Sequence, residues 1–253
     1  LPEVPAATLR YVVELAEVAP AADPPPADAT SPAFAGRSFT VVDDGQGVAL
    51  HLSALLEERG ATVRLVGTAE DEGATPDGAL VHLAFLAHDT ELTLAQAFAQ
   101  VRAAVLAGAD TLVLATGLGG GFGFGPAATA GDLLPAGSGI HGLARTVARE
   151  HPACRVRAVD LDPKDDPQRL AEHLLAEVAD LAEGDELVDV GRTNGTRQTL
   201  QVVPAPLDPA AAPAGHAPPL VTADSVVLLT GGARGITARV AVALAREGCG
   251  HLH

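Results

Sequence analysis

Apolar and polar positions alternate along this chain with two different periodicities. Short apolar runs bounded by turn residues predict buried strands, and they occur at 38–44, 61–67, 78–86, 110–117, 154–162 and 185–205. Between them, apolar residues recur every three or four positions, which predicts amphipathic helices. Strands that alternate with such helices pair in parallel through right-handed crossovers. The pattern therefore predicts a doubly wound, mainly parallel α/β sheet over residues 38–204.

Each helical segment has one apolar face. In 45–60 that face consists of Val48, Leu52, Leu55 and Leu56, and Gly60 is the expected C-cap. The three later faces are Leu94, Phe98, Val101 and Val105; Ile140, Leu143, Ala144, Val147 and Ala148; and Leu170, Leu174, Leu175, Val178 and Leu181. Asp165 and Asp166 precede the last of these, where a helix N-terminus favours negative charge.

Two linkers rich in proline and alanine divide the chain. The first, at 19–37, follows a predicted strand at 8–18, and the second covers 205–224. Just before the second linker, the Asn194-Gly195 pair predicts a hairpin-like return of the last strand. The expected divisions are a leading strand and linker at 1–37, the α/β body at 38–204, a linker at 205–224 and a final segment at 225–253.

The amino-acid composition limits the classes of binding partner and the cellular compartment that fit this protein. Aromatic residues make up only 3% of the chain, so the core is expected to consist of Leu, Val and Ala. The formal net charge of −16 argues against nucleic acid and against an anionic membrane surface. No segment has the ~18 consecutive apolar residues of a membrane span, and no signal pattern is present. Cys154 and Cys249 have neither metal-site nor disulfide-framework spacing, so we expect a cytoplasmic protein with free thiols and no metal.

The stretch "VVLLTGGARGITARVAVALAREG" at 226–248 predicts a strand, a glycine turn and a helix. Such a turn can bind phosphate, because glycines let backbone amides approach it and the helix N-terminus adds positive charge. Gly231 and Gly232 would form the turn, Gly235 would lie where helix meets strand, and Ile236 would begin the packed helix face. An ordinary tight turn is the alternative. The candidate cofactor-binding residues are Thr230, Gly231, Gly232, Arg234, Gly235 and Ile236.

The earlier stretch "DDGQGVAL" matches this motif only in part. Gly45 and Gly47 match its first two glycines, but Leu50 takes the third position. A leucine there is expected to push helix and strand apart and to fill the space of a phosphate. We therefore expect this copy to serve as scaffold only.

Two of these stretches resemble a known family. "TGGARGIT" looks like the cofactor fingerprint of short-chain dehydrogenase/reductases, and "SGIHGLARTVAREHPACRVRAVDLDP" resembles the structural subdomain of ketoreductase domains in type I polyketide synthases. In that family a degenerate, structural Rossmann-like half precedes a half that binds NADPH and reduces a β-ketoacyl group on an acyl carrier protein. The resemblance implies the same order here, with the remainder of the ketoreductase domain and an acyl carrier protein as partners.

Details of the fingerprint refine what the resemblance implies. The form "TGGARGIT" is most similar to iterative synthases of the polyunsaturated-fatty-acid and enediyne type, although Thr237 stands where most short-chain reductases carry glycine. Arg234 would contact a ribose phosphate, which favours NADPH; an exposed surface arginine is the alternative. The leading strand at 9–18 is similar to the segment that joins the sheet of the second half in that family.

The catalytic residues of that family have no counterpart here. Reduction there uses a tyrosine as general acid, a lysine that lowers its pKa and a serine. The sole tyrosine is Tyr11 and the sole lysine is Lys164, on different predicted elements. We therefore expect no catalytic residue in this chain and no activity from it alone. The strand that should complete the cofactor unit begins at "GHLH", 250–253, as if a larger domain were cut short.

Other motifs favour structural roles. The glycine-rich stretch 117–125 could hold a phosphate, but a mobile loop at the edge of the sheet is favoured. "DLDPKDD" at 160–166 could bind a cation, but a strand end followed by an acidic helix start is favoured. The histidines show no zinc pattern, and His251 and His253 are expected strand residues.

Three functions remain open from the sequence. The first is part of an NADPH-dependent polyketide synthase ketoreductase. The second is a non-catalytic Rossmann-like scaffold that docks neighbouring domains or a carrier protein. The third is a free-standing NAD(P)-binding domain.

Overall fold

The computed structural model describes residues 10–21, 23–26, 31–68, 78–87, 89–124, 137–193, 195–206, 221–231 and 234–253. The chain divides into two compact units. The larger unit is Val12–Val203, and the smaller consists of Leu1–Tyr11 with Pro204–His253.

The larger unit is built on an eight-stranded sheet in the order β1-β8-β7-β6-β5-β4-β2-β3. Neighbours from β3 to β7 pair in parallel, whereas β7 and β8 form an antiparallel hairpin. The doubly wound, mainly parallel sheet and the hairpin-like return predicted from the sequence are confirmed. The strands are β1 (Tyr11–Glu17), β2 (Ser38–Val42), β3 (Thr62–Val66), β4 (Ala79–Phe85), β5 (Thr111–Thr116), β6 (Arg155–Asp160), β7 (Asp189–Thr193) and β8 (Thr196–Pro204).

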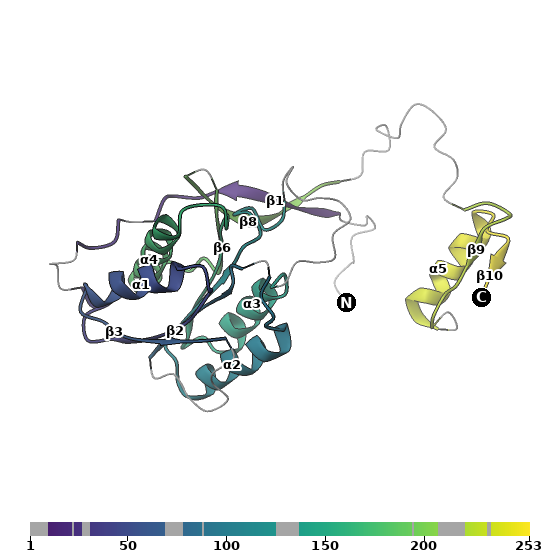
Figure 1. Cartoon of the computed structure of the whole chain (residues 1–253). Coiled ribbons are helices and arrows are strands. Elements are labelled where there is room, and N and C mark those ends of the chain that lie inside the picture. Colours follow the sequence, from purple (N-terminus) through teal and green to yellow (C-terminus); the bar gives the residue numbers. More distant parts are fainter. Residues whose placement is uncertain are drawn as a thin grey trace. The chain divides into compact units, whose positions relative to one another are not determined.

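Four helices cover the two faces of this sheet: α1 (Val48–Glu57), α2 (Leu94–Leu106), α3 (Ile140–Glu150) and α4 (Pro167–Glu183). Helices α1 and α4 pack together on one face, while α2 and α3 cover the other (Figure 1). The core under α1 and α4 includes Leu52, Leu174 and the fully buried Phe34, which comes from the segment before β2. The core under α2 and α3 includes Val101 and Ile140.

Helix α2 forms where predicted but buries a different face. Its buried residues are Ala97, Val101 and Ala104, whereas Leu94 and Phe98 are 44% and 51% exposed. The small alanines let the helix lie close to the sheet, so the larger side chains are displaced to its flank. The predicted apolar face was therefore wrong at Leu94 and Phe98.

Helix α4 begins where its sequence predicts. Asp166 is the N-cap, and its carboxylate accepts hydrogen bonds from the amides of Gln168 and Arg169. Pro167 follows at the first helical position, where its missing N–H costs nothing. Gly184 ends the helix in the left-handed conformation, with φ of 102°.

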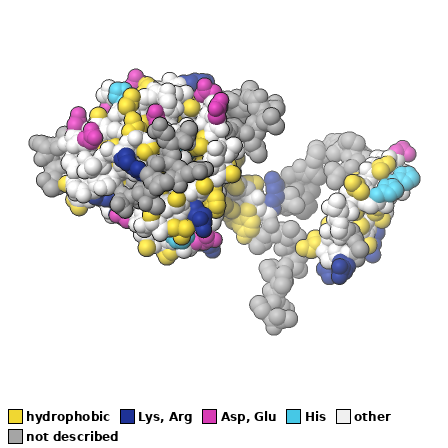
Figure 2. Space-filling model, turned by 60° about the horizontal axis from the view of Figure 1, so that its bottom comes forward, with side chains coloured by type: hydrophobic (Ala, Val, Ile, Leu, Met, Phe, Trp, Pro, Cys, Tyr) yellow, Lys and Arg dark blue, Asp and Glu magenta, His cyan; other side chains and the backbone are white. Residues whose placement is uncertain are grey.

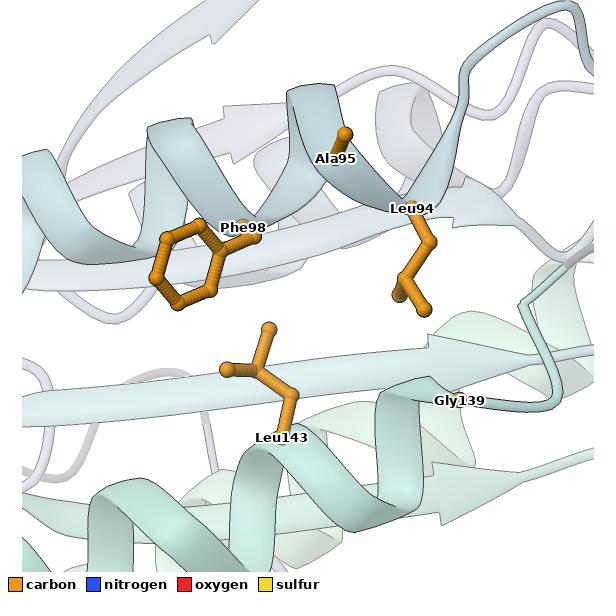
Figure 3. A pocket seen from close by; sticks show the side chains of 5 residues that line it. All are labelled: Leu94, Ala95, Phe98, Gly139 and Leu143. Carbon is orange, nitrogen blue, oxygen red and sulfur yellow. The ribbon is translucent and has the colours of Figure 1, made fainter. Parts of the chain in front are cut away.

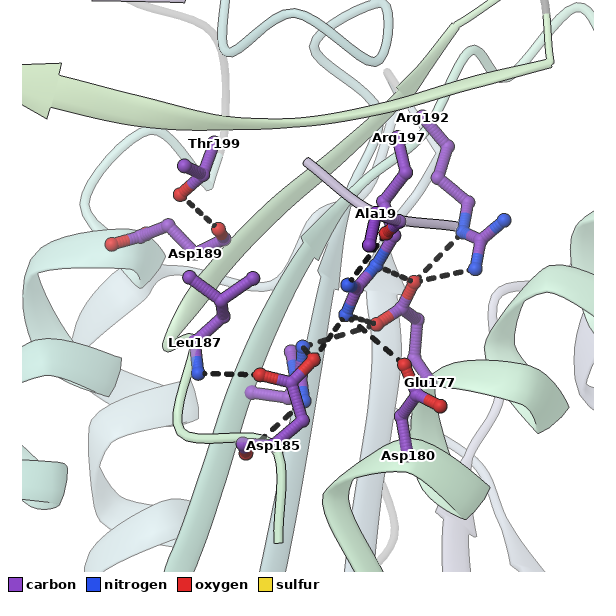
Figure 4. Close-up of polar contacts among 10 residues, drawn as sticks. Ala19, Glu177, Asp180, Asp185, Leu187, Asp189, Arg192, Arg197 and Thr199 are labelled. Carbon is purple, nitrogen blue, oxygen red and sulfur yellow. Dashed lines mark hydrogen bonds and ion pairs between the residues drawn. The ribbon is translucent and has the colours of Figure 1, made fainter. Parts of the chain in front are cut away.

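A buried ion cluster joins α4 to strands β6, β7 and β8 of the sheet (Figure 4). The fully buried Glu177 accepts hydrogen bonds from Arg157 of β6, Arg192 of β7 and Arg197 of β8, at 3.1, 2.8 and 2.8 Å. Asp185 also accepts from Arg197, at 2.8 Å. Since each arginine is less than a fifth exposed, these charges depend on one another for compensation.

The smaller unit contains one strand–helix–strand motif. Strand β9 (Val226–Val227) leads through the glycine turn into α5 (Gly235–Arg246), and β10 (His251–Leu252) pairs in parallel with β9. The amide of His253 continues this pairing by donating to the carbonyl of Val227 at 3.0 Å. The predicted strand and helix are thereby confirmed, as is a strand within 250–253, whereas residues 232–233 of the turn lie outside the described residues.

Apolar side chains lie on the surface of this smaller unit, as the space-filling view shows (Figure 2). Helix α5 has no buried residue. The most exposed of the large apolar side chains are Ile236, Leu228 and Val226, at 83%, 76% and 69%. Ile236 was predicted to begin a packed face, and this was wrong, because two short strands are too narrow to cover both flanks of a helix.

Cys154 and Cys249 are both free and buried. Within the described residues, no helix has the length and apolarity needed to cross a bilayer.

The ion cluster generates a stability prediction. We expect Glu177→Gln to lower the free energy of unfolding by about 3–5 kcal/mol, because it removes the central negative charge and leaves buried guanidinium groups without compensation. Glu172→Gln, at an exposed position of the same helix, should change it by less than about 0.5 kcal/mol. Urea denaturation followed by circular dichroism measures both. Equal effects of the two variants would show that the cluster does not carry buried charge.

Candidate functional site

The predicted cofactor residues lie at the junction of β9 and α5. Gly231 and Gly235 both have the left-handed backbone that glycine adopts freely, with φ of 73° and 67°. Open space lies where their β-carbons would be. Gly232 lies outside the described residues. The turn therefore has the backbone form that the motif predicts at the two described glycines.

The N-cap residue of α5 does not cap the helix through its side chain. Arg234 is the N-cap residue of α5, in an extended conformation, and makes no side-chain cap hydrogen bond. Both Arg234 and Thr230 are exposed. The first turn of a helix carries unpaired amides and a partial positive charge, so this end of α5 remains able to receive an anion. The assignment of these residues to a cofactor stays a prediction.

The earlier glycine turn, between β2 and α1, is filled by the chain itself. Asp44 is 5% exposed, and its carboxylate accepts hydrogen bonds from the amides of Val48 and Ala49, at 3.3 and 2.8 Å. The amide of Gln46 donates to the same group at 3.1 Å. A protein carboxylate therefore occupies the place where a phosphate would sit.

The expectation that this copy is only scaffold was based on Leu50, and that reason was wrong. Leu50 is 61% exposed, so it neither separates helix from strand nor fills the anion position. The residue that fills it, Asp44, comes before the first glycine of the motif.

A second carboxylate fills the glycine-rich segment 117–124 at the end of β5. Asp160, fully buried at the end of β6, accepts hydrogen bonds from the amides of Leu118 and Phe122, both at 2.7 Å. The same segment lies so close to β7 that a β-carbon at Gly120 would overlap the carbonyl oxygen of Arg192. Segment 117–124 is thus held against the sheet by these contacts, and a phosphate would have to displace Asp160. Gly125 lies outside the described residues.

The acidic stretch at 160–166 has structural roles, as favoured from the sequence. Asp160 holds the glycine-rich segment, Asp162 accepts from the amide of Lys164 at 3.1 Å, and Asp166 caps α4. Among the described residues, no three His, Cys, Asp or Glu side chains gather in a way that could hold a metal ion.

Tyr11 and Lys164 lie on separate elements, as predicted. Tyr11 is the first residue of β1 and is 53% exposed, and Lys164 is exposed in the turn between β6 and α4. Neither makes a hydrogen bond through its side chain among those the structure describes.

An open apolar groove of about 430 Å³ lies between the starts of α2 and α3 (Figure 3). Its lining residues are Leu94, Ala95, Phe98, Gly139 and Leu143. Because none of these side chains can ionise or donate a hydrogen bond, the groove offers no acid, base or nucleophile.

His82 is a buried titratable group that the sequence pattern did not single out. It lies on β4 beside Val42 of β2, where the strand order of the sheet reverses. Its Nε2 donates to Oε1 of Gln100 at 2.9 Å, and its ring stacks on Phe85 with centroids 5.7 Å apart. Burial lowers the pKa of His82 to about 4, outweighing the hydrogen bond to Gln100, so the ring is neutral in the folded protein.

Comparison with solved structures agrees with this architecture. The chain matches A-type ketoreductases from a modular polyketide synthase with 27% identity and a TM-score of 0.60, over 96% of this chain and 52% of the solved one. A C2-type ketoreductase from a modular polyketide synthase matches with 23% identity and a TM-score of 0.61, over 96% and 52%. The chain has the ketoreductase fold.

A further match is the ketoreductase from the first module of phoslactomycin biosynthesis in Streptomyces sp. HK803. It is 20% identical with a TM-score of 0.52, over 96% of this chain and 46% of the solved chain. This chain thus spans about half the length of the ketoreductases that it matches. No protein-family model and no curated protein matches the sequence.

Asp44 provides a direct test of the filled turn. We expect Asp44→Ala to lower the free energy of unfolding by about 2–3 kcal/mol, because amides of the α1 N-terminus lose a buried acceptor. Asp43→Ala, which removes only the partly exposed bond to the amide of Gly45, should cost about 0.5–1 kcal/mol. Added inorganic phosphate should stabilise the Asp44→Ala protein more than the unaltered one in thermal melts. Absence of this rescue together with a small cost would contradict the filled-turn interpretation.

The lowered pKa of His82 predicts that the folded protein loses stability as the pH falls. The unfolded chain binds a proton at this histidine below pH 6.5, but the folded protein does so only below about pH 4. The stability that the neutral ring contributes is therefore complete above pH 6.5 and is lost as the pH falls toward 4, on the order of 3 kcal/mol in all. We expect His82→Leu to flatten the decline between pH 6.5 and 4.5, and the exposed His51→Leu to leave it unchanged. An unchanged decline in His82→Leu, measured by urea unfolding at several pH values, would refute this.

Proposed function

We propose that this chain is part of a polyketide synthase ketoreductase that reduces carrier-protein-bound β-ketoacyl thioesters with NADPH. In this proposal the larger unit is the structural half, and residues 225–253 begin the cofactor-binding half. The remainder of the ketoreductase domain and an acyl carrier protein of the same synthase would be its partners, in the cytoplasm.

The observation that carries the proposal is the contrast between the glycine turns. In the larger unit, Asp44 and Asp160 occupy the amides that could bind a phosphate. In the smaller unit, the turn before α5 has the same left-handed glycines and no cap from Arg234. Carboxylates thus occupy the turns of the larger unit, whereas Arg234 does not cap α5, and this contrast supports a division between a structural and a cofactor-binding half.

Exposed apolar residues at the edge of the larger sheet support the bracing role. Val13 and Leu15 of β1 are 46% and 38% exposed, and alternate residues of a strand share one face. Val202 of the neighbouring β8 is 63% exposed. Such a surface favours contact with a neighbouring domain over contact with water.

NADPH is proposed because of the charge of Arg234. An exposed arginine at the N-cap of α5 can reach an anion bound at that helix end, and a guanidinium suits a ribose phosphate. The "TGGARGIT" form further suggests an iterative synthase of the polyunsaturated-fatty-acid or enediyne type. The solved neighbours described above come from modular synthases, so this finer assignment depends on the motif alone.

A non-catalytic scaffold remains a second candidate, because the filled turns of the larger unit need no nucleotide. The two candidates differ in what the gene encodes after residue 253. A serine, together with a tyrosine and a lysine four residues apart, supports the ketoreductase, whereas a stop codon supports the scaffold.

The activity test uses this chain and, where the gene continues past residue 253, the longer polypeptide that it encodes. We expect this chain alone to show no NADPH-dependent reduction of a β-keto thioester, and the longer polypeptide to show it in a spectrophotometric assay at 340 nm. In the longer polypeptide, Arg234→Ala should raise the KM for NADPH roughly tenfold to a hundredfold and leave that for NADH nearly unchanged, because one charge-assisted contact is lost. Arg239→Ala, an exposed arginine on the same helix, is the control. Reduction by this chain alone would overturn the division of roles.

A further inference from the structure

A chain of buried hydrogen bonds crosses the carboxyl end of the larger sheet. The hydroxyl of Thr116 lies 2.9 Å from Nε2 of His141 and 2.9 Å from Oδ1 of Asp160. On the far side of the ring, Nδ1 of His141 lies 2.8 Å from Oδ1 of Asp189. Arg145 closes the chain by donating from Nε to Oδ2 of Asp189 at 2.5 Å. Apart from Arg145, each of these residues is less than a tenth exposed.

The Asp160 end of this chain holds the glycine-rich segment 117–124 in place. The carboxylate accepts the amides of Leu118 and Phe122, and the ring of Phe122 meets His141 edge-on with centroids 5.1 Å apart. Phe122 has a φ of 56° and is the one non-glycine residue with positive φ among those the structure describes. The left-handed conformation costs free energy for such a residue, so the segment depends on these contacts to remain closed.

The two bonds of Thr116 require one proton more than its hydroxyl supplies. Burial raises the pKa of Asp189, but hydrogen bonds from His141 and Arg145 outweigh it and lower that pKa, so Asp189 is ionised and accepts the proton of Nδ1. Thr116 can donate to Asp160 or to Nε2, but not to both. Both contacts are hydrogen bonds only if a further proton sits on Nε2 of His141 or on the carboxyl of Asp160. Without it, one contact becomes two facing lone pairs in a buried site.

The groups around this site are neutral or already paired, so the further proton is carried by His141 or Asp160. Segment 117–124 has no ionisable side chain, and β5 contributes only the Thr116 hydroxyl. Helix α3 contributes Arg145, which is engaged by Asp189. Gln198 of β8, which donates to the carbonyl of Gly120 at 2.7 Å, is neutral. Burial, the largest influence, raises the pKa of Asp160, against the opposing hydrogen bonds from Phe122, Leu118 and Thr116.

We propose that Asp160, Thr116, His141 and Asp189 form a proton-dependent latch. The latch holds segment 117–124 against the sheet while these four hydrogen-bonded residues carry their shared proton, and it releases the segment when that proton is lost.

The direction of the pH dependence follows from the number of protons in each state. Once the segment opens, water reaches the pair, and an imidazole and a carboxyl in water release their protons above about pH 6.5 and 3.9. Above pH 6.5, for as long as the closed pair keeps its shared proton, the closed state therefore holds one more proton than the open state. The closed state loses stability as the pH rises, by at most about tenfold in the opening equilibrium per pH unit.

Amide hydrogen exchange measured by NMR on the whole 253-residue chain tests the latch. After correction for the intrinsic pH dependence of exchange, protection of the Leu118 and Phe122 amides should fall by about tenfold to a hundredfold between pH 6.5 and 8.5. The amides of Val48 and Ala49 are a control within the same molecule, because they bond to a buried carboxylate, Asp44, through contacts that include no histidine. Their protection should not change.

A pair of variants separates the shared proton from general loosening. Thr116→Val preserves shape but removes the linking hydroxyl, so the pH dependence at Leu118 and Phe122 should disappear. Thr146→Val removes the hydroxyl that donates to the carbonyl of Gly142, at an exposed position of α3, and should leave the dependence intact. The proposal is overturned if the Leu118 and Phe122 amides of the unaltered chain follow the Val48 and Ala49 amides, a comparison that needs no variant to fold. Full retention of the dependence in Thr116→Val also overturns it.

Discussion

The larger unit depends on one physical constraint: a backbone amide removed from water must have an acceptor. Turns at the carboxyl ends of parallel strands gather several such amides, especially where glycines bring the backbone close. In a nucleotide-binding protein the phosphate supplies the acceptor. Here Asp44 and Asp160 supply it from within the chain, each to at least two amides. The sheet keeps the architecture of a binding fold and satisfies its donors without a ligand.

A second constraint concerns side-chain charge, since a buried charge must have a partner of opposite sign. The layers of the larger unit are filled by Leu, Val and Ala, and the sheet extends past the helices through the β7–β8 hairpin. Glu177 fastens that hairpin to α4 through Arg192 and Arg197. Charged contacts of this kind contribute little net stability compared with apolar packing, but they are costly to break singly. They therefore fix which strand lies next to α4 more than they stabilise the fold.

Sequence patterns predicted the elements well because strand and helix periods are local properties. The burial of α4 along Leu170, Leu174 and Leu181 follows directly from its spacing. The errors arose where burial depends on a distant neighbour. Phe98 and Ile236 have helical spacing, but alanines bring α2 closer to the sheet and nothing in the described smaller unit covers the flank of α5. The partners of Asp160 and Glu177 lie 15 to 44 residues away, and no local pattern encodes such contacts. One signal for Asp44 was available, since an acidic residue before a glycine turn can accept the amides that follow it.

The two strand–turn–helix units of this chain differ most at that position. Asp44 precedes Gly45 in the larger unit, and Thr230 precedes Gly231 in the smaller one, while both glycines have left-handed backbones with φ of 69° and 73°. A carboxylate is charged and long enough to reach the first helical turn, so it competes with any incoming anion for the same amides. A threonine hydroxyl is neutral and shorter, and it leaves most of the helix-end potential unused. Under the proposed function, the chemistry of the one side chain before the first glycine would decide which of the two turns receives a nucleotide.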